Sequence, residues 1–240
     1  MAPLRVALLI ALMAATALSS PALYLPDLGT MDAGWSRHFL RNGINHFDHG
    51  EYIYSLEQLD SALSHAPNSG TAALVHIYKA RDFYGLKNYA KAREELEAAL
   101  RAAPESGFAC AAAGTAAYQA DRYAEALDYF QRGLKTAPHH DLLLDNFAWF
   151  RATCPDPTFR NGADAVRFAT EACELAHWKD SAFIDTLAAA QAESGNFAAA
   201  AATEQRALNE KDAERIERAA AQKRLQLYSR NQPYRAKSGR

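Results

Sequence analysis

One short stretch occurs three times and decides the fold: DSALSHAP at residues 60–67, EAALRAAP at 97–104 and QRGLKTAP at 131–138. The copies are separated by 37 and then 34 residues, and each ends in a proline, which cannot continue a helix. Tyrosines at 52, 89 and 123 follow the same two steps. A period near 34 residues is typical of repeat proteins in which each unit is a pair of helices that buries its apolar face against its neighbours.

Small residues keep the same register as the tyrosines, and they are expected to let neighbouring helices approach closely. The set is Gly43, Ala80, Gly114, Ala148 and Ala188 before the aromatic position, and Ser55, Ala92, Ala126, Ala165 and Ala200 after it. Beyond residue 140, Phe197 takes the place of the tyrosine, and an insertion, CPDPTFRNG at 154–162, separates two helices. We therefore predict an all-α fold, a right-handed α-solenoid over residues 36–209. Its five helix–turn–helix repeats lie near 36–69, 73–106, 107–140, 141–180 and 181–209.

The three copies resemble the end of the second helix of the tetratricopeptide repeat (TPR). Two further stretches resemble a bacterial TPR subgroup with an LAW-x-x-ATCPDP-like repeat: NFAWFRATCPDPTFRNGADAVRFATEACELAHWKD at 146–180 and DTLAAAQAESGNFAAA at 185–200. The stretch RLQLYSRNQPYR at 224–235 resembles the tail that follows such repeats. The resemblance covers roughly residues 36–235 and implies a helical scaffold that binds a protein partner. Asn42 and His46 depart from it, because the family prefers apolar or aromatic residues there.

The first 22 residues have the features of a secretory signal peptide. Met1 and Arg5 supply the positive start, VALLIALM at 6–13 is the apolar run, and small residues allow cleavage after Ala22. Cleavage after Ala17 and retention as an anchor are the alternatives, although the run is short for a membrane span. We expect an exported protein of the periplasm or cell envelope of a bacterium, in which residues 23–35 form an irregular segment before the first repeat.

The last 31 residues are expected to form a cap and a tail. Ala213, Ile216, Ala220 and Leu227 are spaced for one apolar stripe, so residues 210–228 are predicted to form a helix that covers the end of the solenoid. Residues 229–240 are polar and are predicted to be a basic disordered tail. Nine Lys and Arg against four Asp and Glu give residues 210–240 a charge of +5, whereas sixteen against twenty-four give residues 23–209 a charge of −8.

Composition excludes several classes of protein. With 49% hydrophobic residues the 240-residue chain is too apolar to be disordered, and a formal net charge of −2 is too balanced for a general nucleic-acid binder. Three cysteines cannot form a disulfide-dense scaffold. The sequence contains no phosphate-binding glycine loop, GxSxG motif or HExxH motif. We therefore predict no enzyme, no catalytic residue, no cofactor and no metal site.

Cysteines and histidines are the remaining candidates for chemistry. Cys110 and Cys173 occupy apolar repeat positions and are expected in the core. Cys154 lies in the insertion, where a disulfide with Cys173 and a role as nucleophile are both open. The run HFDHGE at 46–51 is expected to be polar residues at a helix end, and in HHD at 139–141 the aspartate is expected to cap the next helix.

The concave groove is the predicted binding surface, because the first helices of stacked repeats line it. Aromatic and arginine side chains on such a surface are typical of binding hot spots. The predicted partner-binding residues are Arg37, Ile44, Phe47, Leu74, Ile77, Arg81, Tyr84, Phe108, Thr115, Tyr118, Gln119, Asp145 and Trp149. Packing against a neighbouring helix is the alternative for each of them. Arg37 and Arg81 without an Asn pair do not match the Lys and Asn set with which some TPR proteins hold a terminal carboxylate.

These features predict an exported scaffold or adaptor that binds a peptide or protein segment in the groove. The alternative from another class is an envelope assembly protein that contacts anionic lipid or polymer through the basic tail. An enzyme that uses Cys154 is the third hypothesis. No nucleic-acid partner is expected, and membrane contact is expected only through the signal segment or the tail.

Overall fold

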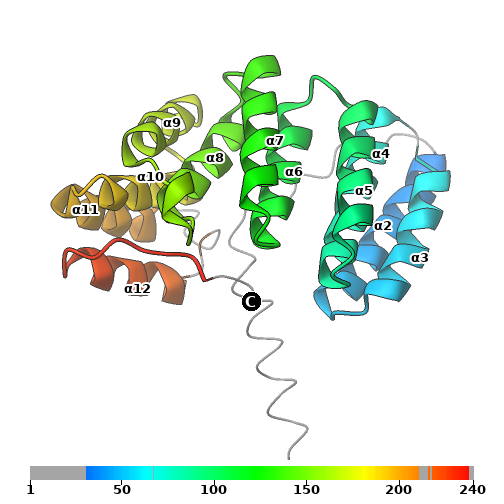
Figure 1. Cartoon of the computed structure of the whole chain (residues 1–240), viewed down its shortest axis with the longest axis horizontal. Helices are drawn as coiled ribbons and strands as arrows, with labels where there is room; N and C mark the ends of the chain where they lie inside the picture. Colours follow the sequence, from blue (N-terminus) through cyan, green and yellow to red (C-terminus); the bar gives the residue numbers. More distant parts are fainter. Residues whose placement is uncertain (1–30, 67, 211–215, 217, 238–240) are drawn as a thin grey trace, which may run out of the picture.

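A computed structural model describes residues 31–66, 68–210, 216 and 218–237 (Figure 1). Over these residues the chain is helical and contains no strand. The helices follow one another in pairs, one pair for each predicted repeat, and a single helix follows the last pair. They are α2 (Met31–Asp48) with α3 (Tyr52–Ser64), α4 (Ser69–Gly85) with α5 (Tyr89–Ala102), α6 (Gly107–Gln119) with α7 (Tyr123–Thr136), α8 (Asp141–Thr153) with α9 (Gly162–Leu175), α10 (Ser181–Glu193) with α11 (Phe197–Asn209), and α12 (Arg218–Tyr228). The predicted fold class, an α-solenoid of TPR-like repeats with a C-terminal capping helix, is confirmed.

The pairs stack in chain order along an arc, which Figure 1 shows from blue to orange. The first helix of each repeat contacts the first helix of the next, in the series α2, α4, α6, α8 and α10. A Cβ atom at Gly43 would lie 2.9 Å from Leu59, and one at Gly114 would lie 2.6 Å from Phe130. These glycines therefore let the two helices of a repeat approach closely, as the sequence predicts.

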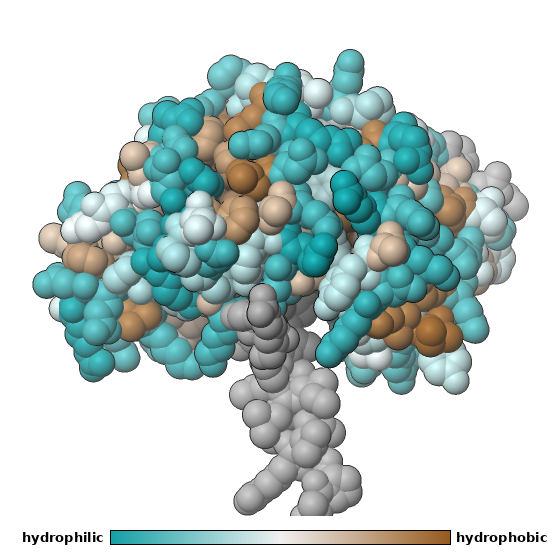
Figure 2. Space-filling view, in the orientation of Figure 1, coloured by the Kyte–Doolittle hydropathy of each residue, from teal (hydrophilic) through white to brown (hydrophobic). Residues whose placement is uncertain are grey.

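Aromatic stacking joins the third repeat to the fourth in the largest core. The ring centroids of Phe130 in α7 and Phe147 in α8 are 5.3 Å apart, and those of Phe147 and Phe168 in α9 are 5.1 Å apart. All three side chains are buried, and each such ring pair adds about 0.5–1.5 kcal/mol beyond the area that it buries. On the face shown in Figure 2 the surface is mostly hydrophilic, with apolar residues in small patches. Stacking buries the side chains of this core, whereas Trp35, Ile53 and Tyr54 in the first repeat stay more than half exposed.

The turn inside most repeats requires one residue with positive φ. This residue always lies two positions before the aromatic residue that begins the second helix: Gly50 (φ 75°), Lys87 (φ 58°), Asp121 (φ 60°) and Gly195 (φ 84°). Left-handed backbone costs roughly 1–2 kcal/mol for a residue other than glycine. The fourth repeat lacks this turn and has instead the insertion, in which Pro157–Phe159 form a 3₁₀ turn.

The N-terminal boundary differs from the prediction. Helix α2 already begins at Met31, so residues 31–35 are helical rather than irregular. The predicted signal peptide (1–22) and residues 23–30 lie outside the described residues. Among the described helices, none has the length and apolar character needed to cross a membrane.

The cap of the fourth repeat also differs. His140, not Asp141, occupies the N-cap of α8, where its ring nitrogen accepts a hydrogen bond from the backbone N–H of Leu143 at 3.4 Å. Asp141 is the first helical residue, and its carboxylate accepts from the N–H of Leu142 at 2.7 Å. A carboxylate in the first turn still stabilises the positive end of the helix dipole, which explains why the sequence signal is misleading by one position.

Candidate functional site

Among the predicted groove residues, Arg81 on α4 lies at the centre of a cluster with two aromatic side chains. The guanidinium carbon of Arg81 lies 4.4 Å from the ring centroid of Phe47 on α2 and 5.3 Å from that of Tyr78. Two aromatic faces therefore hold one cation in place, an arrangement worth about 0.5–1 kcal/mol per contact at a partly exposed site. Phe47 and Arg81 remain half-buried, so both keep surface that a partner can contact.

Tyr84, at the end of α4, belongs to a polar junction rather than to the open surface. Its hydroxyl donates to the Glu125 carboxylate on α7 at 3.4 Å, and Arg122 donates to the same carboxylate at 2.8 Å. Burial, together with the Glu125 charge, raises the pKa of Tyr84. The hydroxyl therefore stays protonated and joins the second repeat to the third.

Four of the predicted partner-binding residues are buried and are corrected to structural positions. Leu74 and Ile77 are each 1% exposed, Asp145 is 3% exposed and Tyr84 is 9% exposed. The physical reason is that the first helix of an internal repeat contacts helices on both sides, so these positions face neighbours. The prediction stays with the other residues: Arg37 and Gln119 are exposed, and Ile44, Phe47, Arg81, Phe108, Thr115, Tyr118 and Trp149 are half-buried.

The C-terminal segment of the chain packs against Trp149, one of the predicted groove residues, at the ends of α8 and α10. The ring of Tyr234 packs on Trp149 with centroids 5.8 Å apart, and the backbone N–H of Ala236 donates to the Thr153 carbonyl at 3.0 Å. Arg235 forms an ion pair of 2.6 Å with Glu193, the last residue of α10. The prediction of a disordered tail is therefore wrong for residues 229–237, and residues 238–240 lie outside the described residues.

The insertion meets the tail at the same glutamate. The guanidinium of Arg160 donates to the backbone carbonyls of Cys154 at 2.7 Å and Pro155 at 3.1 Å, and it pairs with Glu193 at 3.1 Å. One carboxylate at the end of α10 thus holds arginines from two segments that lie outside the repeat pattern. Arg160 and Arg235 lie 33 and 42 positions from Glu193 in the sequence, so no local motif predicts these ion pairs.

Arg224 on α12 is a buried charged residue that no pattern in the sequence predicts. Its guanidinium pairs with Asp185 on α10 at 2.7 Å and with Glu204 on α11 at 3.3 Å, while its side chain is 2% exposed. Burial raises the pKa of Glu204 well above its usual range, and the Asp185 charge acts in the same direction. Of the apolar stripe predicted for residues 210–228, Ile216 is buried as expected, and Ala213 lies outside the described residues. Within α12 the buried face is Ala221, Arg224 and Tyr228, so Ala220 and Leu227 are each one position before the buried residue.

Asp82 is another buried carboxyl, and unlike Asp185 and Glu204 it forms no ion pair with a described residue. Its Oδ2 lies 2.7 Å from the Ser55 hydroxyl, which also donates to the Gly43 carbonyl at 2.8 Å, while Oδ1 has no hydrogen-bond partner in the part of the chain described. A hydroxyl has one proton, so both contacts are hydrogen bonds at once only when the Asp82 carboxyl is protonated and donates. Burial raises the pKa of Asp82 to about 7.

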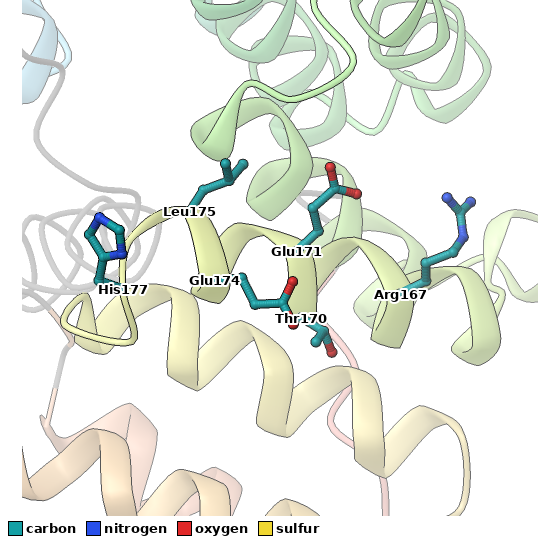
Figure 3. Close-up of a pocket in the computed structure, with 6 residues that line it drawn as sticks. All are labelled: Arg167, Thr170, Glu171, Glu174, Leu175 and His177. Carbon is teal, nitrogen blue, oxygen red and sulfur yellow. The ribbon is translucent and has the colours of Figure 1, made fainter.

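A surface hollow of about 900 Å³ lies along α9 but does not have the geometry of an active site. Its lining includes Arg167, Glu171, Glu174 and His177, whose side chains point in different directions in Figure 3. Glu171 is already paired with His139 at 2.6 Å. No group of three or more potential metal ligands occurs among the described residues.

The three cysteines are free and buried, so no disulfide joins Cys154 to Cys173. Burial raises the pKa of Cys154 to about 11 and that of Cys173 to about 12. Because the thiolate is the nucleophile, a raised pKa and burial both disfavour the hypothesis of a catalytic Cys154. The residues at 46–51 have a structural role, since the His46 ring pairs with Glu51 at 2.6 Å across the turn.

Comparison with solved structures places the chain in a known architecture. The TPR protein TTC0263 of Thermus thermophilus matches with a TM-score of 0.58 at 17% identity, over 81% of this chain and 98% of that one. The pilF protein of Pseudomonas aeruginosa matches with a TM-score of 0.53 at 16% identity, over 73% and 76%. No protein-family model matches the chain, and no curated protein matches it in sequence. The fold is therefore that of bacterial TPR proteins.

Proposed function

We propose that this protein is an interaction scaffold that binds a peptide or protein segment along the concave surface of its first three repeats. The observation that carries the proposal is the stacked set of Phe47, Arg81 and Tyr78. Buried Tyr78 and half-buried Phe47 hold the Arg81 guanidinium in a fixed geometry, and Phe47 and Arg81 keep partly exposed surface for a partner. Preorganised side chains lose little conformational entropy on binding, so more of the contact energy becomes affinity.

The proposal includes export to the periplasm or cell envelope, which rests on the signal-like residues 1–22. The alternative, binding of anionic lipid through the basic tail, gains no support, because Arg235 of that tail is paired with Glu193. Fusing residues 1–22 to a reporter that is active only after export tests the localisation. A reporter that stays inactive would contradict it.

The binding surface is tested by a cross-linked pull-down from envelope extract with matched variants. Arg81→Ala removes the stacked cation, Arg81→Lys keeps the charge without the planar guanidinium, and Arg101→Ala removes an exposed arginine of α5 as control. We expect a partner that the wild type and the control retain, and that both Arg81 variants lose while keeping native helicity. A partner that all four proteins retain would contradict this choice of surface.

A further inference from the structure

Three segments outside the repeat pattern meet where α8 and α10 end. They are the insertion after α8, helix α12 and the segment 229–237, which Figure 1 shows in red as it runs back from α12 toward the middle of the array. The direction reverses in a tight turn, in which Arg230 and Gln232 donate to the Leu227 carbonyl and Asn231 has a φ of 56°. From residue 232 to 237 the segment has no secondary structure of its own.

The contacts of this segment are those by which a groove holds a short extended peptide. One backbone N–H, that of Ala236, donates to the groove at the Thr153 carbonyl. One aromatic ring, Tyr234, packs on an aromatic side chain of α8, and one arginine, Arg235, reaches a carboxylate. A backbone hydrogen bond fixes the register, and the two adjacent side chains contact different residues, Trp149 and Glu193.

The receiving surface is held by the body of the protein rather than by the segment. Arg224, whose guanidinium carbon lies 5.5 Å from the Trp149 ring and 5.7 Å from the Tyr234 ring, is fixed by Asp185 and Glu204. The Thr153 hydroxyl donates to the Trp149 carbonyl at 2.8 Å.

The carboxylate that receives Arg235 is also held from the body. Arg160 fixes one oxygen of Glu193 and leaves the other for Arg235. Trp149 and Glu193 therefore each keep a partner when the segment leaves, while the Thr153 carbonyl loses the hydrogen bond from Ala236, so the two side-chain contacts of the site are preformed.

We propose that the ends of α8 and α10 form a peptide-binding site for an extended aromatic–arginine–small tripeptide, which the chain fills in cis with Tyr234, Arg235 and Ala236. A partner protein that carries this tripeptide binds by displacing the segment. A tether of a few residues gives the cis segment an effective concentration in the millimolar range, so it acts as a competitor that sets the affinity a partner needs. The inference deepens the proposed function, on which it rests, by naming the ligand chemistry around Trp149, one of the predicted groove residues.

The probe is a fluorescent peptide with the sequence of residues 230–237, RNQPYRAK, and the protein is the full chain. In the variant Tyr234→Ala/Arg235→Ala the cis contacts are removed. We expect this variant to bind the peptide at least about tenfold more tightly than the wild type does, because charge-assisted and aromatic contacts then form only in trans. A peptide with alanine in place of its tyrosine and arginine is expected not to bind.

Adding Trp149→Ala or Glu193→Gln to that variant is expected to weaken peptide binding about tenfold or more, whereas Glu171→Gln on the outer face of α9 is expected to have no effect. If the variant Tyr234→Ala/Arg235→Ala loses helicity, displacement of the segment is measured in the wild type instead, by hydrogen exchange. Excess peptide should then increase hydrogen exchange of the Ala236 amide, which the groove otherwise protects.

Three results would overturn the inference: no gain in binding by the folded double variant, binding that ignores Trp149 and Glu193, or dimers of the wild type formed by exchanged tails without peptide binding. The last would assign the site to a second copy of the chain. Loss of a partner in the Arg81 variants concerns the cluster around Arg81, so the two proposals fail independently.

Discussion

The buried carboxyl of Asp82 predicts that stability falls as pH rises toward neutrality. The pKa of Asp82 is about 7 in the folded protein, against an ordinary value of 3.8 that applies to the unfolded chain. Between these two pH values the carboxyl is therefore protonated in the folded protein and ionised in the unfolded chain. In that window the unfolded state carries fewer protons, and the free energy of unfolding decreases with rising pH. The full shift corresponds to roughly 4 kcal/mol, of which about 3 kcal/mol falls between about pH 4.5 and pH 8.

The variant Asp82→Asn isolates this contribution, because asparagine mimics the protonated acid and can still donate to Ser55. We expect the variant to resemble the wild type at about pH 4.5 and to exceed it in free energy of unfolding by roughly 3 kcal/mol at pH 8. Urea denaturation followed by far-UV circular dichroism measures both. Asp128→Asn, at a carboxylate that is 65% exposed, is the control and should change by less than about 0.5 kcal/mol. A difference for Asp82→Asn that moves with pH by less than about 1 kcal/mol would refute the reasoning.

Three further predictions concern packing, the buried arginine and the thiols. Gly114→Ala should lower the free energy of unfolding by about 1–2 kcal/mol, since a clash with Phe130 outweighs the gain in helix propensity. Gly34→Ala, whose new Cβ meets nothing within 4 Å, should raise it by up to about 1 kcal/mol. Equal effects of the two variants in thermal denaturation would contradict this. Asp185→Asn should lower the free energy of unfolding by about 3–5 kcal/mol in urea denaturation, because it breaks the 2.7 Å ion pair with buried Arg224. Glu204→Gln replaces a carboxyl whose pKa is already raised and should change stability by less than about 1 kcal/mol. A larger loss for Glu204→Gln than for Asp185→Asn would contradict a charged Asp185 beside a protonated Glu204. Maleimide should label Cys154 only after unfolding, when all three thiols react without reductant. Rapid labelling of the native protein would contradict the burial of Cys154. Labelling of one thiol in place of three in the unfolded, unreduced protein would show a disulfide.

Periodicity predicts the repeat array because each helix pair repeats the same packing problem. The aromatic residues at 52, 89, 123 and 197 each begin the second helix of a repeat, and prolines 104 and 138 follow the ends of α5 and α7 within two residues. The first helices are harder to interpret, because they contact neighbours on both sides. Leu74 and Ile77 therefore have the same pattern as groove residues but lie in the core.

The C-terminal part escapes prediction for a different physical reason. A polar segment such as 229–237 has the composition of a solvated tail, and its order depends on a carboxylate 42 positions earlier in the chain. Similarly, Arg224 occupies a position that an apolar stripe would fill, and only the approach of Asp185 and Glu204 makes its burial favourable. Sequence patterns report contacts at fixed spacing, whereas these contacts depend on how α10, α11 and α12 come together.

The departures from the repeat pattern are also where this protein differs from a generic solenoid. Stacked helices with small residues at fixed positions explain the arc and its core, and any sequence with that pattern would form them. The insertion, the buried arginine and the C-terminal segment are not needed for stacking, yet all three meet at the ends of α8 and α10, where Arg160 and Arg235 share Glu193. A buried ion network is a poor source of stability compared with apolar packing, but it fixes groups in place. The network therefore holds Trp149 and Glu193 in place, where the proposed peptide site uses them.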